Sequence, residues 1–432
     1  MTESTQRGVL APAHVQADGR RTTWSVDDWL ARLVADAPNT PEIDLPIGAA
    51  FGHVLADDVT AAHALPLWSN SAMDGYAIRA ADAAGDAATA LRIIGEVAAG
   101  SSADPVIEAG EAVRIMTGAP VPSSADAVVP VEETSGDDRG AGEWGESTVR
   151  VLAPVRIGAN VRAAGEDVGA GAVIAQHGWR LTAAGVSALA AAGIAAVRVH
   201  RRPRVAVVAT GSELLPPGSA LERGQIPESN SLLIAGMLRE AGIEPVAVRH
   251  SRDDAAGLAQ MLAQLGDTCD AIVTTGGVGP GTHDIVRIAL EPEPDVIGVR
   301  VAMKPGQLQR AGRLAGGALV FALPGNPVSA AVSFELFVRP TLLAMQGAAR
   351  IHRHRVQARA ATGWRGAAGR LQVLPVILGE DDGMLTCAPA VHARRVSHSV
   401  GGYGASDAYA IVEAGRGDVA PGECVSVIQV GA

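Results

Sequence analysis

The chain has 432 residues, of which 48% are hydrophobic and only 3% aromatic, and it carries a formal net charge of −11. This length exceeds what a single hydrophobic core usually supports and predicts about three domains. The acidic balance argues against a general basic surface for nucleic acid or anionic membranes, although a local basic pocket for an anionic ligand is compatible with it.

The cysteines and the N-terminal residues bear on the cellular compartment. Cys269, Cys387 and Cys424 lie far apart and form no CxxC pair, so we expect neither a disulfide framework nor a structural zinc site. A signal peptide has a basic stretch followed by an apolar one, and the first residues of this sequence lack that pattern. We therefore expect a cytoplasmic protein with no membrane or nucleic-acid partner.

The chain begins with a polar, aperiodic segment over residues 1–22, which we expect to be disordered. Ser25 and Asp28 then form a capping-box-like start to a segment with apolar residues at helical spacing, which predicts an amphipathic helix. We assign residues 23–60, together with residues 153–200, to a discontinuous N-terminal linker domain.

Two segments have the texture of β structure. Residues 61–152 alternate short β-prone runs with Gly, Pro and Asp turns, which predicts a small β-rich module. Residues 346–432 show the same alternation, and there we expect a C-terminal β-barrel-like domain.

Residues 201–345 alternate strand and helix patterns. Apolar runs such as RVAVVAT and DAIVTTGG are separated by segments such as SLLIAGMLREAG and DDAAGLAQMLAQLG, a pattern typical of a doubly wound parallel sheet. The last strand leads into a long helix for which Asn326 is the expected N-cap and Pro327 the first helical residue. The predicted fold class is therefore multidomain, α/β plus β.

The carboxyl ends of the predicted parallel strands collect the unusual residues of this domain. In an open parallel sheet, ligands bind just outside these strand ends. Because several loops with polar residues and glycine follow different strands, we expect one binding site at this edge of the sheet. The residues expected there are Glu213, Gly276, Gly277, Asp284, Lys304, Pro324 and Pro327.

The loop from Gly276 to Thr282 is rich in glycine and lies between a predicted strand and a predicted helix. Its backbone N–H groups, with the dipole of the following helix, suit a phosphate group. The glycine spacing matches neither the dinucleotide fingerprint nor a Walker A loop. A turn that simply needs glycine is the alternative interpretation.

Glu213 and Asp284 are the candidate metal ligands. Magnesium prefers one or two carboxylates, several waters and substrate phosphate oxygens, and these two side chains would stand beside the phosphate cradle. Asp284 lies in the first turn of the next helix, so compensation of the helix dipole is the alternative for it. Lys304 would supply positive charge to the same edge, unless it is a solvated surface lysine.

The stretch NSAMDGYA, Asn70 to Ala77, interrupts a strand-like pattern with small polar residues and the carboxylate of Asp74. Taken alone, it suits an Asx-type turn with Asp-Gly as the turn dipeptide. Its other interpretation is an active-site loop.

These residues also resemble a known family. The chain from about residue 25 to 432 resembles molybdopterin molybdenumtransferases, the MoeA family, and is similar to the C-terminal domain of gephyrin. The stretches that carry the resemblance are NSAMDGYA (Asn70–Ala77), RIMTGAPVP (Arg114–Pro122), AGED (Ala164–Asp167), TGSEL (Thr210–Leu214) and LPGNPVSA (Leu323–Ala330).

The resemblance implies an elongated homodimer of four-domain subunits, with residues 201–345 as the molybdopterin-binding domain. It implies insertion of molybdate into adenylylated molybdopterin, which gives molybdenum cofactor and AMP with the help of Mg²⁺. The site would lie between the α/β domain of one subunit and the β module of the other. The implied catalytic positions are Asp74, Thr117, Asp167, Glu213, Asp284 and Lys304, and the implied substrate contacts include Pro324, Pro327 and Ser397.

The sequence departs from the family pattern at four places. Ser212 replaces an aspartate, Gly279 a serine, Gln307 a second lysine and Val396 a glycine. These departures leave a second hypothesis open, a catalytically weak molybdopterin-binding or scaffold protein. A homologue that inserts tungstate is a further alternative, because molybdate and tungstate have the same shape and charge. The adenylyltransferase of the same pathway is a further candidate partner.

Overall fold

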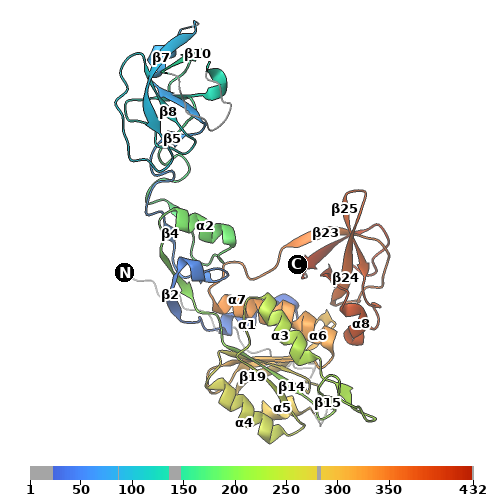
Figure 1. Cartoon of the computed structure of the whole chain (residues 1–432). Coiled ribbons are helices and arrows are strands. Elements are labelled where there is room, and N and C mark those ends of the chain that lie inside the picture. The colour runs from blue at the N-terminus through green and yellow to red at the C-terminus, as the bar shows by residue number, and fades with distance from the viewer. Residues whose placement is uncertain (1–22, 86, 136–146, 280–283, 431–432) are drawn as a thin grey trace, which may run out of the picture.

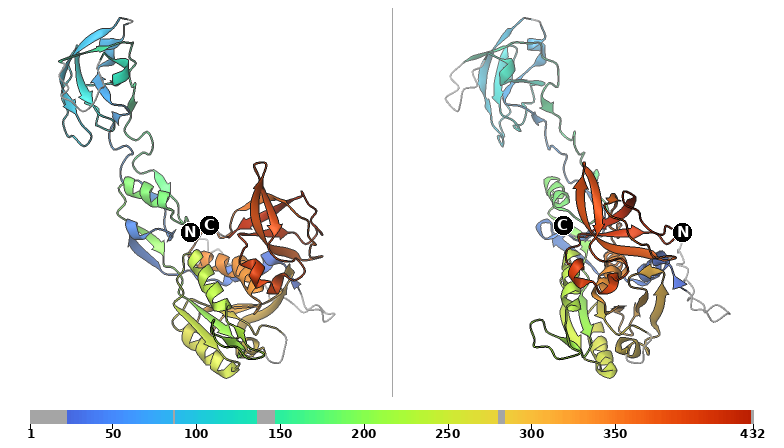
Figure 2. Two further views of the ribbon diagram at one scale, coloured as in Figure 1. Left: turned by 45° about the vertical axis from the view of Figure 1, so that its right-hand side comes forward. Right: turned by 90° about the vertical axis from the view of Figure 1, so that its right-hand side faces the viewer.

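The computed structural model describes residues 23–85, 87–135, 147–279 and 284–430. The chain is elongated, with a β-rich module at one end and an α/β domain at the other, and a narrow linker domain joins them (Figure 1). A C-terminal barrel stands beside the α/β domain, as the turned views in Figure 2 also show. The predicted disordered tail, residues 1–22, lies outside the described residues.

Seven described strands form the sheet of the α/β domain, in the order β1-β19-β21-β22-β18-β14-β17. In chain order they are β1 (Thr23–Trp24), β14 (Val205–Thr210), β17 (Ala247–Ser251), β18 (Ala271–Thr275), β19 (Asp295–Val301), β21 (Leu308–Arg313) and β22 (Leu319–Leu323). The helices are α1 (Val26–Asp36), α3 (Asn230–Glu240), α4 (Ala255–Gly266), α5 (Ile285–Ala289), α6 (Pro327–Ser333) and α7 (Arg339–Met345).

The helices cover both faces of this sheet, as the doubly wound prediction requires. Successive strand residues point to opposite faces. On β14, Val205 and Val207 belong to the core shared with α1, α3 and α6, whereas Ala206 and Val208 belong to the core shared with α4 and α5. All four are fully buried.

The sheet is mixed, however, and not wholly parallel as predicted. Strand β21 runs antiparallel to both β19 and β22. Hydrophobic periodicity identifies a buried strand but carries no information on its direction, so the sequence could not reveal this reversal.

The first described residues also pack differently from the prediction. Strand β1 pairs with β19, and Trp29 of α1 lies in the α/β core with 1% of its surface exposed. Trp24 and Trp29 meet edge to face, with ring centroids 5.6 Å apart. Residues 23–36 therefore pack on the α/β domain, because their apolar face needs the larger core, and not on the linker domain to which we had assigned residues 23–60.

One continuous helical segment crosses the core from Pro327 to Met345. Helix α6 passes through a π-helical turn, η4 (Phe334–Val338), into α7. By length and composition alone this segment would suit a membrane span, but 83% of it is buried inside the protein. It is the central helix of the α/β domain, packed between the sheet and the barrel.

The linker domain is built from two chain segments. Strands β2 (Glu42–Pro46), β13 (Ala196–His200) and β3 (Val54–Leu55) form one small antiparallel sheet. Strands β4 (Val59–Thr60) and β12 (Val173–Ala175) form a two-stranded ribbon beside α2 (Ala183–Ala191).

The β-rich module has a five-stranded sheet in the order β10-β7-β8-β6-β9 and a short ribbon of β5 and β11. Its strands are β5 (Asn70–Ser71), β6 (Gly75–Ile78), β7 (Thr89–Val97), β8 (Glu111–Ile115), β9 (Ala127–Pro130), β10 (Thr148–Val151) and β11 (Val161–Arg162).

The C-terminal domain is a closed five-stranded barrel, which confirms the predicted β-barrel-like fold. The strand order is β24-β25-β23-β27-β26, and a pairing of β24 with β26 closes the cylinder. Its elements are β23 (Arg355–Ala360), β24 (Leu371–Asp381), β25 (Met384–Pro389), the short helix α8 (Val400–Tyr403), β26 (Ala408–Val412) and β27 (Cys424–Gln429). Strand β20 (Met303–Lys304) of the α/β domain pairs with β24 and ties the two domains together.

Candidate active site

The carboxyl ends of β14, β18 and β22 converge at one edge of the α/β sheet. The backbone N–H of Gly276 donates to the carbonyl of Leu323 at 3.1 Å, and the hydroxyl of Thr210 donates to the carbonyl of Thr275 at 3.0 Å. From α3, the side-chain amide of Asn230 donates to the carbonyl of Gly325 at 2.7 Å. The structure therefore brings the Glu213, Gly276 and Pro324 loops together at the predicted edge.

The two glycines after β18 are required by close packing. Gly276 has φ +99°, and a Cβ there would stand 2.7 Å from both the carbonyl and the hydroxyl oxygen of Thr210. Gly277 has φ +58°, and a Cβ there would stand 3.0 Å from the backbone nitrogen of Val286 in α5. Positive φ angles and such short approaches favour glycine. The loop thus lies directly against the first turn of α5.

Glu213 and Asp284 follow the neighbouring strands β14 and β18. The exposed carboxylate of Glu213 curls back over Gly211, with Oε2 2.5 Å from where a Gly211 Cβ would stand. Asp284 is the N-cap residue of α5, and its Oδ2 lies 2.7 Å from where a Gly279 Cβ would stand. Two carboxylates therefore occupy loops at the same sheet edge.

This donor set fits Mg²⁺ better than a metal that is bound by protein ligands alone. The described residues contain no group of three His, Cys, Asp or Glu side chains arranged to hold a metal ion. Magnesium commonly takes one or two carboxylates and completes its shell with water and substrate phosphate oxygens. Glu213 and Asp284 meet that smaller requirement.

Lys304 lies where the α/β domain meets the barrel. Burial lowers the pKa of its ammonium group, and the positive charges of Arg370 and Arg394 lower that pKa further. Two arginines of the barrel therefore share the surroundings of a half-buried lysine of the α/β domain. A concentration of positive charge of this kind attracts an anionic ligand.

Ser397 belongs to a short 3₁₀ helix, η5 (Val396–His398), which packs against α6. The first residue of α6 is Pro327, and its last, Ser333, lies close to the Lys304 loop, because a Cβ on Gly306 would stand 2.8 Å from the Ser333 hydroxyl. Lys304, Ser397 and Pro327 thus border one helix.

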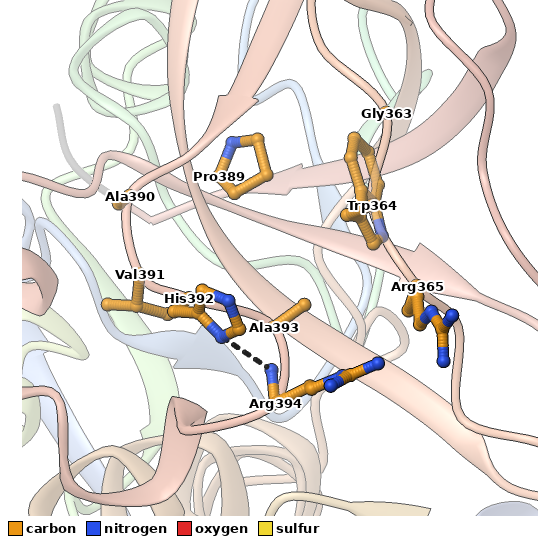
Figure 3. Close-up of a pocket in the computed structure, with 9 residues that line it drawn as sticks. All are labelled: Gly363, Trp364, Arg365, Pro389, Ala390, Val391, His392, Ala393 and Arg394. Carbon is orange, nitrogen blue, oxygen red and sulfur yellow. Dashed lines mark hydrogen bonds between the residues drawn. The ribbon is translucent and has the colours of Figure 1, made fainter.

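The barrel contributes a pocket of about 570 Å³ that the sequence did not predict. Trp364 and Arg365 lie on one segment, and Pro389 to Arg394 lie on the facing one (Figure 3). The backbone N–H of Arg394 donates to Nδ1 of His392 at 3.3 Å. The basic clusters in GWRGAAGR and VHARR were the available signal, but only the fold places them beside Lys304.

Asp74, in the loop after β5, meets Thr117, in the loop after β8, on the β module. The backbone N–H and the hydroxyl of Thr117 both donate to Oδ1 of Asp74, at 2.6 and 2.8 Å. Both bonds favour the ionised form, so they lower the pKa of Asp74, the backbone bond most strongly. The carboxylate is exposed and anionic at neutral pH.

Asp167 lies just beyond one end of the short ribbon of β5 and β11. Its backbone N–H donates to the carbonyl of Leu65 at 3.1 Å, whereas Asp74 follows β5 at the other end, beyond the pairing of Ser71 with Val161. The side chain of Asp167 is exposed. Asp74 and Asp167 are thus held by one ribbon but lie at its opposite ends.

The predicted site residues therefore form two groups in one chain. Asp74, Thr117 and Asp167 lie in or next to the β module, and the other group lies at the edge of the α/β sheet and the barrel. The linker domain separates the two groups (Figures 1 and 2).

Comparison with known proteins assigns the chain to a family. Residues 24–193 match the MoeA N-terminal region (domain I and II), residues 206–344 a probable molybdopterin binding domain, and residues 357–430 the MoeA C-terminal region (domain IV). Molybdopterin molybdenumtransferase 2 of Mycobacterium tuberculosis is 39% identical over 314 residues, which cover 71% of this chain and 75% of that protein. The chain belongs to the MoeA family.

Other members of the MoeA family agree with this assignment. Molybdopterin molybdenumtransferase of Staphylococcus aureus is 33% identical over 333 residues, or 76% of this chain and 77% of that protein. The crystal structure of the MoeA molybdopterin biosynthesis protein from Pyrococcus horikoshii OT3 matches 95% of this chain and all of that chain, with a TM-score of 0.79 and 27% identity. These relatives place the chain, as a MoeA-family member, in molybdenum cofactor biosynthesis.

Proposed function

We propose that this MoeA-family enzyme inserts molybdate into adenylylated molybdopterin, giving molybdenum cofactor and releasing AMP. Family membership and the molybdopterin-binding domain support the substrate class. The glycine loop and two carboxylates at the sheet edge, with a lysine and two arginines where the α/β domain meets the barrel, support a phosphate-bearing ligand.

The observation that carries the proposal furthest is the separation of the two residue groups within one chain. Asp74 and Thr117 serve the same reaction as Glu213 and Asp284 only if a second subunit brings its β module to the first subunit's sheet edge. We therefore propose a homodimer with two shared active sites, related by two-fold symmetry.

Each group has a proposed task. Gly276 and Gly277 let the loop approach the phosphates, and the N–H of Gly277 is the proposed donor, because that of Gly276 is bonded to Leu323. Lys304 with Arg394 holds anionic oxygens. Glu213 and Asp284 would hold Mg²⁺, which when bound neutralises phosphate charge. Pro324, Pro327 and Ser397 contact the substrate. Asp74, held by Thr117, faces the dithiolene end, where molybdate enters, and Asp167 supplies a further carboxylate from the other end of the same β5–β11 ribbon.

The direct test uses purified protein, adenylylated molybdopterin, molybdate and Mg²⁺. We expect stoichiometric release of AMP, measured by chromatography, and product that activates a molybdenum-free apoenzyme. A parallel reaction with tungstate tests the alternative oxyanion. Release of AMP without active cofactor, or no AMP at all from folded protein, would contradict the proposal.

Two further proposals concern a partner protein and the cellular location. The adenylylated substrate must come from an adenylyltransferase, which we propose as a direct partner and which a co-purification experiment tests. We also propose a cytoplasmic location, which suits the three unpaired cysteines.

A further inference from the structure

A second cavity, of about 590 Å³, lies between the linker domain and the α/β domain. The linker side consists of β12, the turn that follows it and α2, and the α/β side consists of α7 and the residues after it. The backbone N–H of Ala349 donates to the carbonyl of Gly178 at 2.9 Å, which closes one side of the cavity. None of its lining residues belongs to the site described above.

The charge in the lining is entirely positive. Arg180, Arg339 and Arg350 line the cavity, and the lining residues that the structure describes include no Asp or Glu. The hydrogen bonds of Arg180 go to neutral acceptors, from Nε to the carbonyl of Gly52 at 3.1 Å and from NH2 to the carbonyl of Ala241 at 3.0 Å. These bonds orient the guanidinium but leave its charge uncompensated.

Arg339 has an incomplete set of partners. Its side chain is 12% exposed, and its nearest carboxylate, Glu335, lies 3.6 Å away. Glu335 also pairs with Arg353, at 2.9 Å, so one carboxylate serves two arginines. The Nε of Arg339 is buried and has no hydrogen-bond partner among the residues that the structure describes. A buried donor without an acceptor is costly, but this Nε has almost no accessible surface, and NH1 donates to the carbonyl of Ile351 at 3.2 Å. An occupant of the cavity therefore meets Arg339 through the accessible part of its guanidinium group.

The arginines also disfavour one another's charge. Burial lowers the pKa of Arg180, and Arg202 and Arg353 lower it further. Burial likewise lowers the pKa of Arg339, where Glu335 opposes the shift and Arg353 and Arg180 add to it. The cluster therefore holds more positive charge than its own carboxylate balances.

The rest of the wall is apolar. Ile174, Leu181 and Leu343 line it, together with Trp179, a residue that is 49% exposed. Ligand pockets typically have this volume and combine apolar walls with a few charged groups. Arginine suits a carboxylate, because its planar donors match the two carboxylate oxygens.

We propose that this cavity is a binding site for a small organic monoanion with a flat apolar body, such as an aromatic carboxylate. The apolar body packs beside Trp179 and Leu343, and the carboxylate accepts from the guanidinium groups of Arg339 and Arg350. Because its walls come from two domains, an occupant contacts both and holds the linker domain against the α/β domain.

The test uses 1-naphthoate and its uncharged analogue 1-naphthamide, titrated into the full-length protein by calorimetry. We expect 1-naphthoate to bind, and 1-naphthamide to bind about tenfold more weakly, because it lacks the charge that the arginines recognise. Arg350→Gln should weaken 1-naphthoate binding, whereas Arg150→Gln in β10, far from the cavity, should not.

A second pair of variants tests the location. Ala188 of α2 lines the cavity and Ala190 of the same helix does not. Ala188→Phe should fill the space and abolish binding, while Ala190→Phe leaves it unchanged. Absence of 1-naphthoate binding to wild type up to roughly 5 mM, or equal binding to all four variants, would overturn the proposal. A third result would also overturn it: wild type binds no probe, and Ala188→Phe changes the oligomeric state. A second copy of the chain would then fill the cavity.

Discussion

Thr117 holds Asp74 with two donors, its backbone N–H and its hydroxyl, and both reach the same carboxylate oxygen. The two residues are 43 positions apart and meet because the loops after β5 and β8 pack together: Gly118 donates to the carbonyl of Ser71, and Ser71 donates to that of Ala119. The second carboxylate oxygen of Asp74 is thereby set in one orientation on an exposed surface.

Thr117→Val tests the electrostatic part of this relationship. A depressed pKa in the folded state stabilises the protein above the ordinary aspartate pKa, and this stabilisation is lost as pH falls through the depressed value. Valine removes the hydroxyl bond, so the pKa of Asp74 rises and the loss begins at higher pH. The melting temperature of Thr117→Val should therefore lie below that of wild type near pH 7, where wild type has the full stabilisation, and the difference should shrink as pH falls through the pKa of Asp74. Thr117→Ser should follow wild type at every pH, and a Thr117→Val deficit that is absent near pH 7, or that stays constant into the acid range, would contradict the assignment.

Gly75→Ala tests why the residue after Asp74 is glycine. The sequence allowed an Asp-Gly turn, but Gly75 begins β6 and pairs with Ile115 on one side and Pro130 on the other. A Cβ there would overlap the backbone carbonyl of Val129. Because backbone must move, we expect a loss of about 3 kcal/mol or more in unfolding free energy.

The matched control for Gly75→Ala is Gly95→Ala in β7 of the same module, where a Cβ meets nothing within 4 Å. Denaturant unfolding of both variants gives the comparison. Equal stability of the two would mean that the close approach at Gly75 relaxes freely.

The proposed shared site predicts complementation between subunits. Neither Asp74→Ala nor Asp284→Ala homodimers should be active, because each lacks one group in both sites. A heterodimer of the two variants has one intact site, so its turnover should reach about half that of wild type. Two different affinity tags isolate the heterodimer for the AMP-release assay. A verified heterodimer with no more activity than its parents would exclude a site shared in this way.

Asp284→Asn separates a metal ligand from a helix cap. Asparagine keeps the shape and caps helices well, so the loss of dipole compensation costs at most about 1 kcal/mol. If Asp284 binds Mg²⁺, turnover should fall strongly at limiting Mg²⁺ and recover in part at high Mg²⁺. Mg²⁺ titrations and melting curves on the same samples distinguish the two roles. Near-normal turnover at limiting Mg²⁺ would show that the ion is held elsewhere.

Much of the architecture followed from patterns in the sequence. Alternating strand and helix periods predicted the doubly wound domain, and strand ends predicted that the Gly276, Glu213 and Pro324 loops would meet. The antiparallel direction of β21 could not be predicted, because hydrophobic periodicity does not depend on the direction of a strand. Residues 23–36 were misassigned, because an amphipathic helix shows that it needs a core but not which one.

For the site, too, the sequence can group residues at one sheet edge but not residues that the packing of domains brings together. Loops that follow neighbouring parallel strands come together by geometry, so the sequence could group them. The convergence of Lys304 with Arg370 and Arg394 depends on how the barrel docks on the α/β domain, and no local pattern encodes that. The distance of Asp74 from Glu213 within one chain likewise depends on the length of the linker domain.

The ribbon of β4 and β12 has a consequence for how the chain unfolds. Val59 and Thr60 pair with Val173 and Ala175, and Leu65 donates to the carbonyl of Val168 just beyond. The whole β module is thus an insertion whose two ends are clamped side by side, so its presence adds little loop-closure entropy to the host. Host and insertion have separate cores and are expected to unfold as separate cooperative units. The arm that presents Asp74 can then lose its structure while the far end of the chain, with its sheet and barrel, stays folded.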